Sequence, residues 1–167
     1  MNNKTYTFQP EKKIFKQGSF LTDEEGKIVY EAKMLKQPLF SAYQFLFKNH
    51  ITNKEVEHKV GHTLTSEMGG NGYIDIFSTK SYFKFDGKNI WDYLHEEGIR
   101  IETHAASGKL GLDYTITLKG KPMAEIKSGG KFLGNHVVFN LITSEENLDL
   151  GFLVAFAVAR TEQAFLD

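Results

Sequence analysis

Residues 150–159 read Leu-Gly-Phe-Leu-Val-Ala-Phe-Ala-Val-Ala, a run without a polar side chain. As an α-helix this run would be about 15 Å long, half the hydrocarbon thickness of a bilayer, so it is too short to span a membrane. A helix that is apolar on every side has to be enclosed by protein. Glu145, Glu146 and Asp149 precede the run, and negative charge is favourable near the start of a helix. The pattern therefore predicts a buried helix over about 145–165.

The rest of the chain has the pattern of short β-strands separated by turns. Residues 110–118 alternate strictly between apolar and polar side chains, which is typical of a strand with one buried and one exposed face. Aromatic residues make up 13% of the chain, and many short aromatic segments between glycine turns favour an all-β sandwich or barrel. The pattern predicts nine or ten strands, with the clearest at residues 20–22, 28–34, 39–47, 73–77, 82–85, 99–104, 110–118, 123–127 and 132–142.

Two segments have other patterns. Ile90, Tyr93 and Leu94 have helical spacing, and the glycine at position 98 can end a short helix over 90–97. Residues 127–131, Lys-Ser-Gly-Gly-Lys, lack the spacing of a phosphate-binding P-loop and lead into an apolar pair. We interpret 127–131 as a flexible connection between strands.

A chain built of strands encloses an apolar helix most simply as a barrel with the helix through its middle. Phe152 and Phe156 would fill the interior, and Gly151 would let a strand approach closely. The competing arrangement is a helix that caps an open sheet, but such a helix needs a polar stripe. We therefore predict a mainly β fold, a closed antiparallel barrel around the helix. The length of 167 residues fits one domain over 1–167.

This expected arrangement resembles the tubby C-terminal domain superfamily, which includes the LURP-one-related proteins and the phospholipid scramblases. Residues 20–30, Phe-Leu-Thr-Asp-Glu-Glu-Gly-Lys-Ile-Val-Tyr, look like the family's strand–Asp-x-x-Gly–strand unit, and residues 149–161 look like its terminal helix. Element order and length are similar over nearly the whole chain, and small bacterial LURP-one-related proteins are similar in size. The resemblance implies a barrel of about twelve strands and a non-enzymatic role near membranes or in signalling.

Net charge and composition limit the classes of partner that the chain is expected to bind. The chain has 20 basic and 21 acidic residues and a formal charge of −1, so no global charge indicates nucleic-acid binding. It has no cysteine, which excludes disulfides and thiolate metal sites. The first ten residues are polar and lack a signal-peptide core. We expect a cytoplasmic protein without a transmembrane span, in peripheral contact with the membrane if its partner is lipid.

Lysines gather in the second half of the chain. Four of them are candidates for contact with an anionic lipid surface or an acidic protein partner: Lys119, Lys121, Lys127 and Lys131. Each basic residue near anionic lipid contributes about 1 kcal/mol. The alternative is that lysines on turns and edge strands keep a β-protein soluble and block edge pairing. The two arginines, Arg100 and Arg160, supply few of the bidentate forks that bind phosphate, so the residues do not indicate a phosphoinositide-specific site.

Little in the sequence indicates catalysis. His58 and His62 are four residues apart, but Gly61 lies between them and no His-Glu-x-x-His pattern is present, so we predict no metal site and no cofactor. The chain also lacks a Gly-x-Ser-x-Gly elbow. We therefore expect a non-enzymatic binding or scaffold module. The alternative is an enzyme or small-ligand binder with a cleft at the barrel mouth around Trp91, Asp92 and His95.

Overall fold

The computed structural model describes residues 2–10, 18–36, 43–61, 84–85, 88–105, 112–133 and 136–166. The first half of the chain supplies β1 (Lys4–Pro10), β2 (Ser19–Thr22), β3 (Ile28–Lys36), β4 (Tyr43–Asn49), β5 (Lys54–Gly61), β6 (Lys84–Phe85) and β7 (Lys88–Asn89). The second half supplies α2 (Ile90–Glu96), β8 (Ile99–Ala105), β9 (Leu112–Leu118), β10 (Lys121–Leu133), β11 (His136–Thr143), the 3₁₀ turn η2 (Glu145–Asn147) and α3 (Leu148–Leu166).

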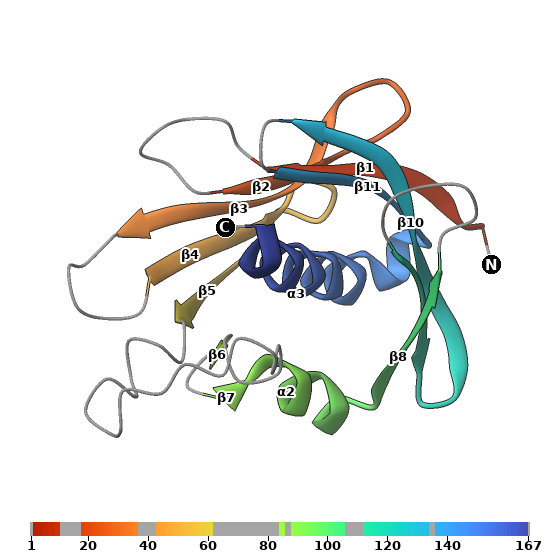
Figure 1. Cartoon of the computed structure of the whole chain (residues 1–167). Helices are drawn as coiled ribbons and strands as arrows, with labels where there is room; N and C mark the ends of the chain where they lie inside the picture. Colours follow the sequence, from red (N-terminus) through yellow and green to blue (C-terminus); the bar gives the residue numbers. More distant parts are fainter. Residues whose placement is uncertain are drawn as a thin grey trace.

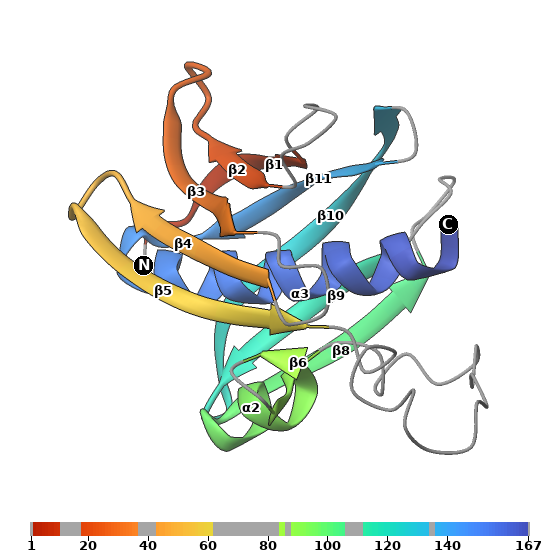
Figure 2. The ribbon, with the colours of Figure 1, turned by 90° about the vertical axis from the view of Figure 1, so that its left-hand side faces the viewer.

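The strands in these ranges form one antiparallel sheet in the order β7-β6-β5-β4-β3-β2-β1-β11-β10-β9-β8. Most neighbours are joined by hairpins, whereas the β1–β11 pair joins the two ends of the chain, with Lys4 opposite Thr143 and Phe8 opposite Phe139. The sheet curves strongly, and its concave face surrounds α3 in both ribbon views (Figures 1 and 2).

The core lies between this concave face and α3. Every residue from Gly151 to Ala159 is buried, as the apolar run predicted. The Phe152 ring lies 4.3 Å from the Tyr30 ring of β3 and 5.7 Å from the Phe47 ring of β4, measured between centroids. The helix therefore packs against several strands at once, and a buried helix inside an antiparallel sheet is confirmed.

The sheet is not a closed barrel of twelve strands, so this part of the fold prediction was wrong. The two ends of the strand order are β7 and β8, and no pairing joins them in the described part of the chain. β7 has two residues and runs directly into α2, which offers no ladder hydrogen bonds to a strand. α2 lies below α3, between the β6–β7 pair and β8 (Figure 1), and contacts β7 and β8. A helix thus stands where the barrel was expected to close.

Local expectations mostly hold where the structure describes them. The predicted helix over 90–97 is α2, and Gly98 follows it with φ of +84°. The hairpin predicted around the Asp-x-x-Gly turn is the β2–β3 pair. Residues 39–42, 62–83 and 110–111, which include all of the predicted strand 73–77, parts of three other predicted strands and His62, lie outside the described residues.

The strand pattern differs from the sequence prediction in two segments and in two further strands. The segment 127–131 is not a connection: it lies inside β10, and the register with β11 shifts between Ser128 and Lys131. The two glycines between them accommodate this β-bulge, which is a usual place for glycine in a strand. The segment 132–142 is therefore not one strand, since β11 begins at His136. β1 and β5 were not predicted.

No helix in the described ranges combines the length and the apolar content needed to cross a lipid bilayer.

Candidate functional site

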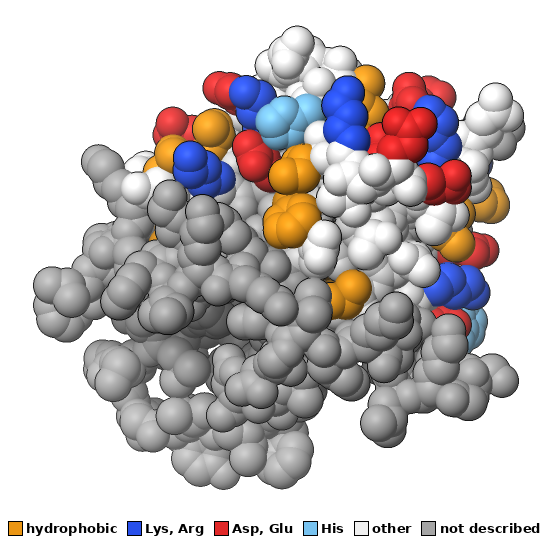
Figure 3. All heavy atoms as spheres, turned by 90° about the horizontal axis from the view of Figure 1, so that it is seen from above, with side chains coloured by type: hydrophobic (Ala, Val, Ile, Leu, Met, Phe, Trp, Pro, Cys, Tyr) orange, Lys and Arg blue, Asp and Glu red, His pale blue; other side chains and the backbone are white. Residues whose placement is uncertain are grey.

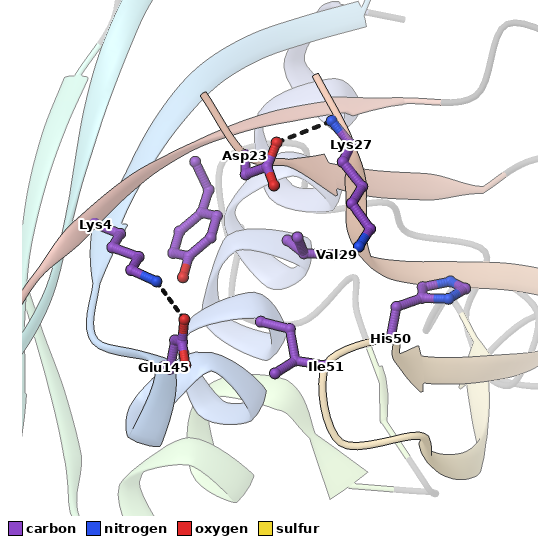
Figure 4. A pocket seen from close by; sticks show the side chains of 8 residues that line it. Lys4, Asp23, Lys27, Val29, His50, Ile51 and Glu145 are labelled. Atoms are coloured by element: carbon purple, nitrogen blue, oxygen red, sulfur yellow. Dashed lines mark hydrogen bonds and ion pairs between the residues drawn. The ribbon is translucent and has the colours of Figure 1, made fainter. Parts of the chain in front are cut away.

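A recess of about 380 Å³ opens at the end of the sheet where η2 leads into α3 (Figure 4). Its volume is at the lower end of the range for small-molecule sites, roughly 300–1,000 Å³. Four parts of the chain line it: β1, the β2–β3 hairpin, the turn after β4, and η2. The lining residues are Lys4, Tyr6, Asp23, Lys27, Val29, His50, Ile51 and Glu145.

Lys4 and Glu145 close one side of the recess. The Lys4 ammonium donates a hydrogen bond to Glu145 Oε1 and forms an ion pair with it. This bond and the negative charge of Glu145 raise the pKa of Lys4 above its ordinary value. The pair connects β1 to the start of the helical segment, and each partner neutralises the charge of the other.

The β2–β3 turn positions Asp23 and Lys27. Asp23 Oδ1 accepts hydrogen bonds from the backbone N–H of Glu25 at 3.0 Å and of Lys27 at 2.9 Å, an arrangement typical of aspartate in turns. Gly26 has φ of +81°, a conformation that glycine adopts at little cost. The Lys27 side chain extends toward His50, away from the Asp23 carboxylate (Figure 4). Its ammonium has no ion-pair partner among the described residues.

Tyr6 is the most deeply buried polar residue of the recess, with 2% of its surface exposed. Its hydroxyl has no hydrogen-bond partner among the described residues. Burial raises the pKa of this hydroxyl above its ordinary value, so at neutral pH it is a protonated donor. A buried polar group without a partner costs about 1–3 kcal/mol. A ligand oxygen that accepted this hydrogen bond would recover that cost.

His50, Val29 and Ile51 form the remaining wall. The His50 N–H donates to the Val29 carbonyl at 2.9 Å, which places the imidazole beside the recess. Its Nε2 lies 3.2 Å from Glu31 Oε1 but without hydrogen-bond alignment. Val29 is buried, and Ile51 has 44% of its surface exposed. The two aliphatic side chains lie between the Lys4–Glu145 side and the Lys27–His50 side (Figure 4).

A second set of bonds fixes the turn that carries His50 and Ile51. Asn49 Oδ1 accepts hydrogen bonds from the backbone N–H of Ile51 at 2.9 Å and of Thr52 at 3.2 Å. Asn49 Nδ2 donates to Asp149 Oδ1 at 3.2 Å, and Asp149 lies in the first turn of α3. The turn after β4 is therefore tied to the start of the helix.

The structure brings together two of the four candidate lysines. Lys119 and Lys121 flank Gly120 in the β9–β10 turn and are exposed. Lys127 lies about 20 Å from Lys121, at about 3.3 Å per strand residue. Its ammonium is 3.8 Å from Asp113 Oδ2 and 3.9 Å from Glu125 Oε2.

The fourth lysine, Lys131, belongs to β10, but its side chain lies outside the described residues. Acidic and basic side chains are interspersed over the coloured part of the face in Figure 3, without a continuous basic area. The four lysines are therefore spread along β10, with two of them at its turn.

The other residues considered for chemistry are dispersed. His58 packs edge-on against the Phe47 ring, with centroids 4.9 Å apart. Among the described residues no three His, Cys, Asp or Glu side chains are placed to bind a metal ion. Asp92 and His95 are exposed on α2, and the side chain of Trp91 lies outside the described residues.

The recess was missed at the level of the sequence because its lining residues come from four distant segments. The alternation of Tyr6 and Phe8 with polar neighbours was a usable signal for β1. Comparison of this chain with protein-family models, curated proteins and solved structures finds no match.

Proposed function

We propose that this chain is a non-enzymatic binding module, with the recess beside Tyr6 as its binding site. α3 fills the space that a barrel-type carrier or enzyme would use for its ligand, since Phe152 and Phe156 are fully buried there. A ligand would therefore bind at the end of the sheet and not in its interior. A distant relationship to tubby-like and LURP-one-related proteins is part of this proposal; it rests on the sequence resemblance of residues 20–30 and 149–161.

The buried Tyr6 hydroxyl carries this proposal. It lines a hollow of small-molecule size and has no hydrogen-bond partner in the described part of the chain. Ligand sites typically combine a partly apolar wall with a few placed polar groups. In this recess Val29 and Ile51 form the apolar wall, and Tyr6 and Lys27 supply the polar groups.

A thermal-shift screen of small metabolites against the full chain tests the proposal. A ligand at about 100 times its Kd stabilises the folded state by about 2.7 kcal/mol, which raises Tm measurably. We expect at least one compound to raise the Tm of the wild type and to have less effect on Tyr6→Phe, which lacks the hydroxyl alone. Lys33→Gln, an exposed lysine of β3, is the control and should respond like the wild type. A screen with no Tyr6-dependent shift would contradict the proposed site.

Peripheral contact with anionic lipid through the β9–β10 turn is a second proposal. It is favoured by the exposure of Lys119 and Lys121 on either side of one tight turn. Sedimentation with phosphatidylserine vesicles should then decrease as salt increases and should be weak with neutral vesicles. Lys121→Glu should reduce sedimentation, whereas the charge-matched Lys33→Glu should not. Equal sedimentation of both variants would show that the β9–β10 turn is not the lipid-binding surface.

A further inference from the structure

We propose that the recess beside Tyr6 binds a small zwitterion of the amino-acid class, with one carboxylate, one ammonium group and a short side chain. This inference rests on the proposed function, since it assigns a ligand class to the same site. It follows from the charges and the apolar wall that line the recess.

The recess holds charges of both signs that are not already paired within it. The Lys4–Glu145 pair is internally neutral. The Lys27 ammonium has no ion-pair partner among the described residues, and the Asp23 carboxylate accepts its two backbone hydrogen bonds through Oδ1 alone. A ligand of one sign would gain a charge-assisted hydrogen bond from only one of Lys27 and Asp23. A ligand with both signs pairs with both groups.

The donors and acceptors define the orientation of such a ligand. The carboxylate of the ligand accepts a hydrogen bond from the Lys27 ammonium, and a ligand oxygen on the side of the Lys4–Glu145 pair accepts one from the buried Tyr6 hydroxyl, which is otherwise without a partner among the described residues. An ammonium group donates to the Asp23 carboxylate. The aliphatic Val29 and Ile51 lie between the Lys4–Glu145 side and the Lys27–His50 side of the recess (Figure 4), where a short side chain would contact them. A volume of about 380 Å³ suits a molecule of this size.

The test begins with thermal shift of the full chain against the common L-amino acids. The amino acid with the largest shift is then compared by calorimetric titration with its deaminated carboxylic acid and its decarboxylated amine, which share its side chain. We expect the amino acid to bind at least about tenfold more tightly than either analogue, because each lacks a charge-assisted bond.

Three variants locate the bound molecule. Tyr6→Phe, Lys27→Gln and Asp23→Asn should each raise the Kd by about tenfold or more. Asn at position 23 retains an oxygen for the turn hydrogen bonds, so that variant removes the charge and keeps the turn. Lys27 is exposed, so Lys27→Gln should fold even if Tyr6→Phe does not. Lys33→Gln and Asp92→Asn, exposed residues outside the recess, should keep the wild-type Kd.

Several results would overturn the inference and still leave the proposed function separately testable. Equal binding of the deaminated acid or of the amine would exclude a zwitterion, while a Tyr6-dependent shift by that compound would support a binding module. Binding of an amino acid that all three variants retain would place it outside the recess. Absence of any shift by amino acids would overturn the ligand class, and the metabolite screen would then decide the function on its own.

Discussion

At the scale of single residues, a few polar side chains and glycines determine how the elements connect. Gly98 ends α2 with φ of +84°, and its carbonyl accepts the Lys119 N–H at 2.8 Å. Asp149, in the first turn of α3, accepts a hydrogen bond from Asn49 Nδ2 in the turn after β4. Both contacts join a helix to a turn between strands, so their loss would act on the packing of elements and not on one element alone.

Gly98→Ala should destabilise the chain more than Gly26→Ala. Both glycines have positive φ, which costs an L-residue about 1–2 kcal/mol. A Cβ at position 98 would also lie 2.9 Å from Lys119 Cγ, whereas a Cβ at position 26 meets nothing within 4 Å. Urea denaturation measures both effects. The double variant Gly98→Ala, Lys119→Ala should recover the difference, and equal losses for the two single variants would show that the contact is not tight.

Tyr30 should make the stability fall at alkaline pH. Burial raises the pKa of its hydroxyl above the ordinary 10.0, and the charge and hydrogen bond of Asp149 raise it further. Above pH 10 the unfolded chain loses a proton that the folded chain keeps, so the free energy of unfolding decreases by at most about 1.4 kcal/mol per pH unit. Below pH 10 the Tyr30 hydroxyl is protonated in both the folded and the unfolded chain, so it does not lower the free energy of unfolding there.

Urea titrations between pH 8 and pH 11 measure this slope. Tyr30→Phe removes the titrating group, so its stability should decrease less steeply with pH than that of the wild type. Parallel curves for the two proteins would contradict the raised pKa.

At the scale of elements, the helix α3 and the bulged strand β10 decide the shape. α3 approaches β11 closely at Gly151, where an added Cβ would lie 3.4 Å from Thr143 Cγ2 and 3.5 Å from Leu141 Cδ2. Thr143 in turn donates its hydroxyl hydrogen to the Met123 carbonyl at 3.1 Å. The small residue therefore brings the helix close to the middle of the sheet, next to β1 and β10.

Substitutions at Gly151 should change stability in opposite directions according to size. Alanine adds an ordinary van der Waals contact and replaces glycine within a helix, which gains up to about 1 kcal/mol. Valine adds two more carbons against Thr143 and Leu141, and overpacking costs about 1–3 kcal/mol. Thermal and urea denaturation of both variants test the order alanine, glycine, valine. A stable Gly151→Val protein would mean that the helix can shift away from β11.

At the scale of the whole molecule, the interior depends on the aromatic rings of α3. Phe156 is fully buried, and its ring lies 5.5 Å from the Phe45 ring and 5.1 Å from the Phe47 ring. Together with Phe152 it fills the concave side of the sheet. The rings of α3 and of the strands that contact it therefore form one hydrophobic core.

Phe156→Asp should prevent folding, because it places a charge in an apolar interior without a counter-charge. Phe156→Ala should fold with a loss of about 3–5 kcal/mol. Circular dichroism and size-exclusion chromatography distinguish these outcomes. A folded, monomeric Phe156→Asp protein would contradict the enclosure of α3.

The parts of the fold that were predictable are those set by local sequence. The burial of α3 could be predicted because its sequence is apolar on all faces. The β2–β3 hairpin could be predicted from the Asp23–Gly26 turn. Closure of the sheet requires β7 and β8 to pair. Whether they pair depends on contacts between distant segments and cannot be predicted from a local sequence pattern. The same holds for the recess, where Tyr6 and Glu145 become neighbours only through the β1–β11 register. The four lysines lie within thirteen residues of sequence, but one precedes β10 and the other three are spread along it.

The order of elements along the chain has a consequence for biosynthesis. Every strand in the described ranges precedes α3 in the sequence, so the ribosome synthesises the concave apolar face of the sheet before the helix that covers it. The β1–β11 pairing also joins segments more than a hundred residues apart, and such distant pairings form slowly. We expect the nascent sheet to expose Phe8, Phe45 and Phe139 until α3 emerges, and exposed apolar surface of this kind favours aggregation or chaperone binding.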